Sequence, residues 1–167
     1  MKKELIIFMP SIEGGGVEKN LFIISKFLVK KKLNLSLITT SKSFRKKFRG
    51  VNLITPKINT LNWGRKSKYF ICLILLLREF FVNKRAVIFS FQANLYCILL
   101  SKIFNRKIII RSNSSPSGWS QNKFKKLIFK YLLSLADKII VNSKEFKNQY
   151  REIFSLNPVV IYNPLNK

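Results

Sequence analysis

The sequence predicts an α/β fold: a doubly wound, mostly parallel, Rossmann-like sheet of about seven strands with helices on both faces. Two observations carry this prediction. Short apolar runs of strand length recur along the chain, and longer segments of helical periodicity lie between them. Several runs are apolar at consecutive positions, as in strands that helices cover on both sides. The length of 167 residues fits one domain.

Seven segments are expected to be strands because each is short and rich in β-branched or aromatic residues. In chain order they are 5–9, 35–40, 51–55, 86–91, 107–111, 138–142 and 159–162. Right-handed crossovers between such strands give a sheet whose ligand crevice lies beyond the carboxyl ends of the strands. The residues that follow each strand are therefore the first candidates for a site.

Amphipathic helices are expected between the strands. The apolar positions that repeat at helical spacing, and are expected to face the core, are Val17, Leu21, Ile24 and Leu28; Phe124, Leu127, Ile128, Tyr131, Leu132 and Leu135; and Phe146, Tyr150 and Phe154. Segment 69–83 is apolar on most helical faces and is expected to be buried, whereas segment 56–67 has no period and is expected to be a loop. Ser143 follows the sixth strand as a natural N-cap.

The charge balance is strongly basic. The chain has 32 Lys and Arg against 7 Asp and Glu, a formal net charge of +25, and no histidine. A His-based general base, a Ser-His-Asp triad and a zinc site of the usual Cys/His kind are excluded, and no metal or cofactor is expected. Three explanations of this charge are open: a nucleic-acid partner, an anionic membrane surface, or an amino-acid composition that results from AT-rich coding DNA. A nucleic-acid partner is not expected, because the basic residues are spread along the chain and no nucleic-acid-binding motif is present.

Membrane contact is expected only at the surface of a cytoplasmic protein. The apolar run after Met1 is shorter than the core of a signal peptide, and the most apolar stretch, 69–77, is too short to span a bilayer. The apolar surroundings of Cys72 and Cys97 indicate buried free thiols. The expected contact with the inner face of the cell membrane is a basic face near Phe129, formed by Lys123, Lys125, Lys126 and Lys130.

A glycine-rich loop follows the first expected strand. Gly14, Gly15 and Gly16 immediately precede a helix. Glycines let the backbone approach a ligand and adopt positive φ, and the free amides at a helix start favour an anion. The loop matches neither the Walker A nor the G-x-G-x-x-G spacing. It is a candidate phosphate cradle, with a purely structural tight turn as the alternative.

A loop of small polar residues follows the fifth expected strand. It contains Arg111, Ser112, Asn113 and Trp119. Hydroxyl and amide groups beside an indole ring suit a sugar, and a buried arginine at this edge needs an anionic partner. The alternative is an ordinary turn of Ser, Pro and Gly.

The loop after the fourth expected strand carries Gln92 and Asn94. Both side chains can hydrogen-bond a polar ligand. Asn94 can instead cap the next helix.

Four segments in order carry a family resemblance: IIFMPSIEGGGVEK, KIIIRSNSSPSGW, ADKIIVNSKEF and VVIYNPL. Together they resemble the amino-terminal domain of the family-4 glycosyltransferases, retaining enzymes of GT-B fold that use nucleotide sugars. The resemblance covers essentially the whole chain. It implies two Rossmann-like domains facing a cleft, the amino-terminal one with most of the acceptor site and the carboxyl-terminal one with the nucleotide sugar.

The resemblance also implies roles for individual residues. Gly14, Gly15 and Gly16 look like the family's loop that reaches the donor diphosphate. Residues 1–162 are then the amino-terminal domain and 163–167 the start of an interdomain hinge, with the donor domain absent. Many relatives carry a histidine near Asn113, which this chain lacks, so the resemblance names no catalytic residue.

The implied activity is transfer of a sugar from a nucleotide sugar to a glycan acceptor, including a lipid-linked one, in cell-envelope polysaccharide or glycoconjugate synthesis. Such a domain is expected to be inactive without its donor half. Two alternatives stay open: a non-catalytic module that binds a nucleotide sugar or a polyanion, and one half of a split glycosyltransferase. The implied partners are the donor, the acceptor, the donor domain and an anionic membrane surface.

Overall fold

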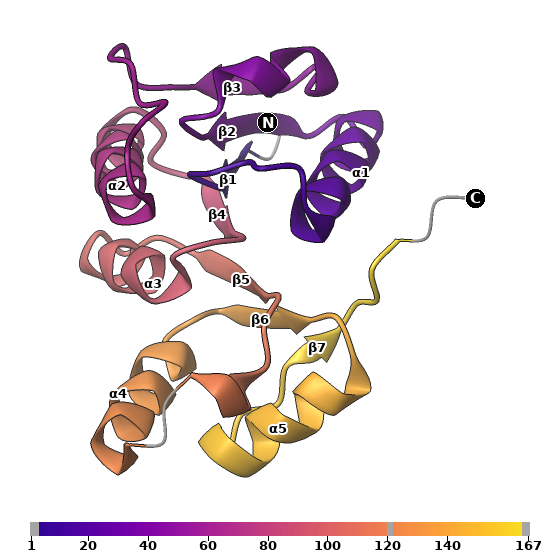
Figure 1. Ribbon diagram of the computed structural model, residues 1–167, viewed down its shortest axis with the longest axis vertical. Coiled ribbons are helices and arrows are strands. Elements are labelled where there is room, and N and C mark those ends of the chain that lie inside the picture. The colour runs from indigo at the N-terminus through magenta and orange to yellow at the C-terminus, as the bar shows by residue number, and fades with distance from the viewer. Residues whose placement is uncertain (1–3, 120–121, 165–167) are drawn as a thin grey trace.

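Seven parallel strands form one sheet in the computed structural model, which describes residues 4–119 and 122–164 (Figure 1). The strand order is β3-β2-β1-β4-β5-β6-β7, and every neighbouring pair is parallel. The strands are β1 (Glu4–Phe8), β2 (Asn34–Ile38), β3 (Asn52–Ile54), β4 (Val87–Ser90), β5 (Ile108–Ser112), β6 (Lys138–Val141) and β7 (Val159–Val160). All seven expected strands are confirmed, and the sheet is parallel throughout.

Five α-helices and two short 3₁₀ helices connect these strands. They are α1 (Gly16–Lys30), η1 (Lys42–Lys47), α2 (Arg65–Val82), α3 (Asn94–Ile103), η2 (Pro116–Gly118), α4 (Lys123–Ser134) and α5 (Lys144–Phe154). Helix α2 includes the end of the segment expected to be a loop, since it begins at Arg65. The expected N-cap is confirmed, because the Ser143 hydroxyl accepts a hydrogen bond from the Phe146 N–H at 3.1 Å.

The core has two parts, one on each face of the sheet. Alternate residues of β1 point to opposite faces, so Ile6 packs in one cluster and Ile7 in the other. The Ile6 cluster contains buried residues of α2, α3, α4 and α5, such as Leu76 and Ile98. The Ile7 cluster contains Leu21 of α1. The sheet is thus buried between helices, which explains its consecutive apolar strand residues.

Two helices are less buried than the sequence predicts. Phe70 and Phe81 of α2 are exposed, although this helix was expected to be buried. In α4 the stripe expected to face the core, which includes Leu127 and Tyr131, faces outward, and Leu133 is the buried residue. These two predictions were wrong because each helix is apolar on more than one side. Periodicity alone does not say which side contacts the sheet.

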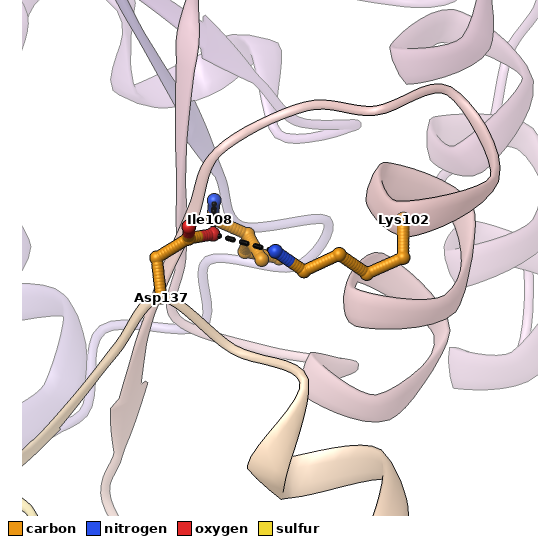
Figure 2. Close-up of polar contacts among 3 residues, drawn as sticks. All are labelled: Lys102, Ile108 and Asp137. Carbon is orange, nitrogen blue, oxygen red and sulfur yellow. Dashed lines mark hydrogen bonds and ion pairs between the residues drawn. The ribbon is translucent and has the colours of Figure 1, made fainter.

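Asp137 connects α3, β5 and the start of β6. Its Oδ2 accepts hydrogen bonds from Lys102 Nζ and from the Ile108 N–H, both at 2.8 Å (Figure 2). Partial burial acts to raise the pKa of the Asp137 carboxyl, but these hydrogen bonds outweigh it and hold the pKa below its usual value. Asp137 therefore fixes the amino end of β5 relative to α3 and β6.

Cys72 and Cys97 are buried free thiols, as expected. Burial raises the pKa of each thiol to about 12, so both are protonated at neutral pH. In the described part of the chain, no helix has the length and hydropathy that crossing a bilayer requires. The expected hinge, 163–167, is described only through Pro164; its remaining residues lie outside the described ranges.

Candidate functional site

The strand order places the candidate site between β1 and β4. The chain adds β2 and β3 on one side of β1, then returns to add β4 to β7 on the other side. In open parallel sheets, ligands bind outside the carboxyl ends of the strands where the order reverses in this way. The loops after β1 and β4 flank that point, and they contain the glycines and Gln92 that the sequence singled out.

Gln92 joins these two loops. The Ser11 N–H donates to Gln92 Oε1 at 3.1 Å, and Gln92 Nε2 donates to the Ser11 carbonyl oxygen at 3.0 Å. Both polar atoms of the Gln92 amide are therefore used within the protein. Its contribution is to hold the β1 loop against the β4 loop.

The loop after β2 holds the β1 loop from the other side. Thr40 Oγ1 donates to the Pro10 carbonyl oxygen at 2.7 Å, and the Ile12 N–H donates to Ser41 Oγ at 3.0 Å. Ser11 and Ile12 are buried as a result. The residues that lead into the glycines are thus fixed on both sides.

The three glycines lie exposed at the start of α1. Gly14 has φ +91°, a conformation that favours glycine, and Gly15 is the N-cap in an extended conformation. No side chain caps the helix, so its first N–H groups lack a side-chain partner. This is the geometry of an anion site, but the buried carboxylate of Glu18 in the first turn adds negative charge beside it.

Asn94 connects the β4 loop to β5. Its Oδ1 accepts a hydrogen bond from Ser90 Oγ at 2.8 Å, and its Nδ2 donates to the Arg111 carbonyl oxygen at 3.1 Å. The N-cap of α3 is Ala93, which has φ +54°, so Asn94 does not cap this helix.

Arg111 is buried and anchors the segment after β7. Its Nη2 donates to Asn163 Oδ1 at 2.9 Å and to the Ile161 carbonyl oxygen at 3.3 Å. Its Nε is buried without a hydrogen-bond partner, and burial lowers its pKa. Among residues 4–119 and 122–164 it forms no ion pair. In place of the anionic partner expected for this arginine, the structure has neutral oxygens of Ile161, at the end of the expected domain, and of Asn163, in the expected hinge.

The remaining polar residues of the β5 loop are also paired within the protein. Ser112 is buried and its hydroxyl donates to the Ser114 carbonyl oxygen, whereas Asn113 Nδ2 donates to the Phe91 carbonyl oxygen at 3.3 Å. The Asn113 bond joins the β5 loop to the β4 loop. The candidate residues of all three loops therefore lie along one edge of the sheet.

Trp119 lies in an aromatic cluster and lines a small apolar cavity. Its ring contacts those of Phe129, Tyr150 and Phe154 at centroid distances of about 6 Å, and its Nε1 donates to Ser114 Oγ at 3.1 Å. The cavity has a volume of 350 Å³. It is lined by Ala93, Asn94, Leu95, Tyr96, Trp119, Phe129 and Leu133.

A larger polar cavity beside the glycine loop escaped the sequence analysis. Its volume is 570 Å³, and it lies where the loops after β1, β2 and β3 meet. The polar residues that line it are Ser11, Glu13, Thr40, Ser41, Lys42, Ser43, Lys57, Asn59, Thr60 and Lys68. The loops after β2 and β3 follow the carboxyl ends of strands, as the candidate loops after β1, β4 and β5 do. The expectation that ligands bind at these ends therefore also points to this cavity.

Metal-ligating residues do not gather at this edge or elsewhere in the described ranges. There, no group of three or more His, Cys, Asp or Glu side chains is placed to hold a metal ion. The groups that the edge offers a ligand are hydroxyls, amides, lysines, carboxylates and the backbone N–H groups of α1.

Known structures share this fold. A glycosyltransferase from Rickettsia africae ESF-5 superposes with a TM-score of 0.68 at 19% identity, over 99% of this chain and 44% of that one. Anabaena Alr3699/HepE in complex with UDP and glucose gives 0.67 at 17% identity, over 98% and 45%. Acinetobacter baumannii MurG gives 0.61 at 12% identity, over 97% and 45%. The chain thus spans less than half the length of these GT-B structures and corresponds to one of their domains.

The sequence comparison identifies the family. No curated protein matches the sequence. The model of Glycosyltransferase Family 4 matches residues 14–167, which is nearly the whole chain and begins within the loop after β1. The chain therefore belongs to glycosyltransferase family 4.

Proposed function

We propose that this chain is the amino-terminal, acceptor-side domain of a retaining glycosyltransferase. The complete enzyme transfers a sugar from a nucleotide sugar to a glycan acceptor, including a lipid-linked one, in the synthesis of cell-envelope polysaccharide or glycoconjugates. One observation carries the proposal. The exposed, uncapped start of α1 follows β1, the strand beside which the strand order of this family-4 domain reverses, and it lies beside a polar cavity of 570 Å³ that the loops after β1, β2 and β3 line.

The start of α1 is the proposed contact for the donor diphosphate. Negative charge on the departing diphosphate grows in the transition state, and fixed N–H donors at Gly15 and Gly16 stabilise it there. Positive φ at Gly14 and the bonds of Ser11 to Gln92 hold these donors in place before the substrate arrives. The UDP and glucose in the Anabaena structure support a nucleotide-sugar donor.

The polar cavity is the proposed place of the acceptor sugar. Its volume lies within the range of about 300 to 1,000 Å³ that is usual for ligand sites. Its hydroxyl and amide groups, at Ser43, Asn59 and Thr60, suit sugar hydroxyls. Of the candidate residues, Gln92 supports this site by holding the β1 loop. The hydrogen bonds of Asn94, Arg111, Ser112 and Asn113 instead join β4, β5 and the segments after β4, β5 and β7 to one another.

A transfer assay with the full-length protein tests the proposal. A panel of nucleotide sugars is offered with glycan acceptors in water-soluble and lipid-linked forms, and the anomeric configuration of any product is determined by NMR. We expect transfer from one donor with retained configuration. Nucleotide-sugar binding without transfer to any acceptor would favour the binding module, and inverted configuration would contradict the retaining mechanism.

A further inference from the structure

The outer surface of α2, α3 and α4 is apolar over all three helices. They lie side by side on one side of the sheet, and α3 contacts both neighbours (Figure 1). Each helix buries one stripe in the same core cluster and exposes large apolar side chains on the opposite stripe. These side chains, 40% to 69% exposed, are named here the outer apolar face: Phe70, Ile74, Phe81, Tyr96, Leu99, Ile103, Phe124, Leu127, Ile128 and Tyr131.

Helix α3 has only apolar residues at its exposed positions, which is unusual for a helix that faces water. Its exposed residues are Tyr96, Leu99 and Ile103, and all three are apolar. A helix that faces water normally carries polar or charged residues at such positions. Contiguous exposed apolar side chains mark a surface that binds another apolar surface.

The charged residues around the outer apolar face are mostly basic. Glu79 is the only acidic residue in the three helices, and its carboxylate accepts a hydrogen bond from Asn83 at 2.7 Å. Arg78 lies on the exposed side of α2 between Ile74 and Phe81. In α4, exposed basic residues border the apolar stripe at Lys123, Lys125 and Lys130.

We propose that the outer apolar face docks on an anionic lipid bilayer. Aromatic and aliphatic side chains on a helix lying in the interface enter the boundary between headgroups and acyl chains, and neighbouring lysines and arginines contact the lipid phosphates. No described helix can span the bilayer, so the contact is peripheral. The basic border thus complements the negative charge of the membrane surface.

A second copy of the chain fits this face less well. Symmetric pairing through the outer apolar face brings the basic residues of both copies together without acidic partners. The chain that follows β7 leaves on the side of the sheet away from α2, α3 and α4 (Figure 1).

The apolar cavity extends from this face to the start of α3. Tyr96 belongs to the outer apolar face and also lines the 350 Å³ cavity, whose wall includes Asn94 at the start of α3. Docking would bring the bilayer next to the carboxyl edge of the sheet. A bilayer at this position suits transfer to an acceptor that is anchored by a lipid chain. The inference about the acceptor rests on the proposed function, whereas the inference of membrane contact does not.

Vesicle sedimentation of the full chain tests the contact without donor or acceptor. Vesicles of phosphatidylcholine are compared with vesicles of equal parts phosphatidylcholine and phosphatidylglycerol. The test variants are Phe124→Ser and the pair Lys123→Glu with Lys125→Glu, whose new carboxylates suit the first turn of a helix. The matched controls on α1 are Phe27→Ser and the pair Lys26→Glu with Lys30→Glu, also at exposed positions.

We expect sedimentation with the anionic vesicles and about tenfold less with the neutral ones. Both α4 variants should weaken the binding about fivefold or more, and the α1 controls should change it less than about twofold. Equal binding to both vesicle types, or equal loss in the α1 controls, would overturn the proposal. A lipid-free dimer that Phe124→Ser dissociates would assign the face to a second copy instead. Lipid binding without any glycosyl transfer would refute the proposed function alone.

Discussion

Gln92 and Ser11 exchange two hydrogen bonds across the boundary between β4 and β1. The two residues are far apart in the sequence, and the reversal of strand order brings their loops together. The side-chain amide of Gln92 accepts from the N–H of Ser11 and donates to its carbonyl oxygen, as the backbone of a neighbouring strand does in a sheet. This pairing fixes the loop that leads into Gly14, so the position of the candidate anion site depends on a side chain from the other half of the sheet.

Replacing Gln92 should loosen the β1 loop. In Gln92→Ala, the N–H and the carbonyl of Ser11 both lose their partner in a buried setting, which should lower the free energy of unfolding by about 1 to 3 kcal/mol. Urea denaturation measures this change. Gln149→Ala serves as a comparison, because it removes the hydrogen bond that Ser115 of the β5 loop donates to Gln149 of α5. A loss below about 0.5 kcal/mol in Gln92→Ala would show that the pairing contributes little.

Substitutions at Arg111 should separate its charge from its shape. Arg111→Met removes a buried guanidinium that has no anionic partner among the described residues. The variant loses the hydrogen bonds to Asn163 and Ile161, but it also avoids the free-energy cost of removing a charged group from water, and the two effects offset each other. Arg111→Lys keeps the charge without the planar fork. We expect the Met variant to be as stable as the parent within about 1 kcal/mol and the Lys variant to be less stable by about 2 kcal/mol.

Thermal and urea unfolding of both Arg111 variants give the comparison. Limited proteolysis after residue 160 provides a second readout, because Met frees the segment that Arg111 anchors. A Met variant less stable than the Lys variant would mean that the guanidinium bonds outweigh the burial of its charge.

Asp137 should make the free energy of unfolding decrease at acidic pH. Hydrogen bonds hold the pKa of the Asp137 carboxyl in the folded state below its usual value, so the folded state binds fewer protons than the unfolded state as the pH falls toward about 4. The stabilisation is present above about pH 4 and is lost as the pH falls through the folded pKa. Asp137→Asn should remove this part of the acid dependence and cost about 1 kcal/mol at pH 7. Urea denaturation between pH 3 and 7 measures it, with the exposed Glu152→Gln as control; identical profiles for both would contradict the assignment.

The two thiols should be unreactive until the protein unfolds. Burial raises the pKa of Cys72 and Cys97 from 9.0 to about 12, so the folded state keeps protons that the unfolded state releases above about pH 9. Stability should therefore be unaffected by the thiols below pH 9 and fall as the pH rises toward 12. DTNB at pH 8 should label neither thiol in the native protein and both in denaturant. Rapid labelling of the native protein would show that the α2 and α3 core opens.

The sequence predicts the strands well because each is an apolar run buried on both faces, a pattern that depends only on local composition. It fails for α4, where Phe124 and Leu127 form as regular a stripe as the one that holds Leu133. The choice between the stripes depends on where Trp119 and Phe154 pack, which no local pattern states. Likewise, the pairing of Gln92 with Ser11 follows from strand order. The glycines were found from sequence because a helix start after a strand is a local signal.

Glycosyl transfer by the full-length protein carrying Gly15→Val tests most directly whether the start of α1 serves the reaction. Gly64→Val is the matched control, because Gly64 is also an uncapped N-cap glycine in an extended conformation, at the start of α2. A Cβ at Gly15 comes within 2.9 Å of Oε2 of the buried Glu18 side chain, whose end must shift to admit it, and a Cβ at Gly64 meets nothing within 4 Å. We predict that kcat falls about 100-fold in Gly15→Val and stays within about twofold of the parent in Gly64→Val. Equal transfer by the two variants would contradict a role for the glycine loop in the reaction.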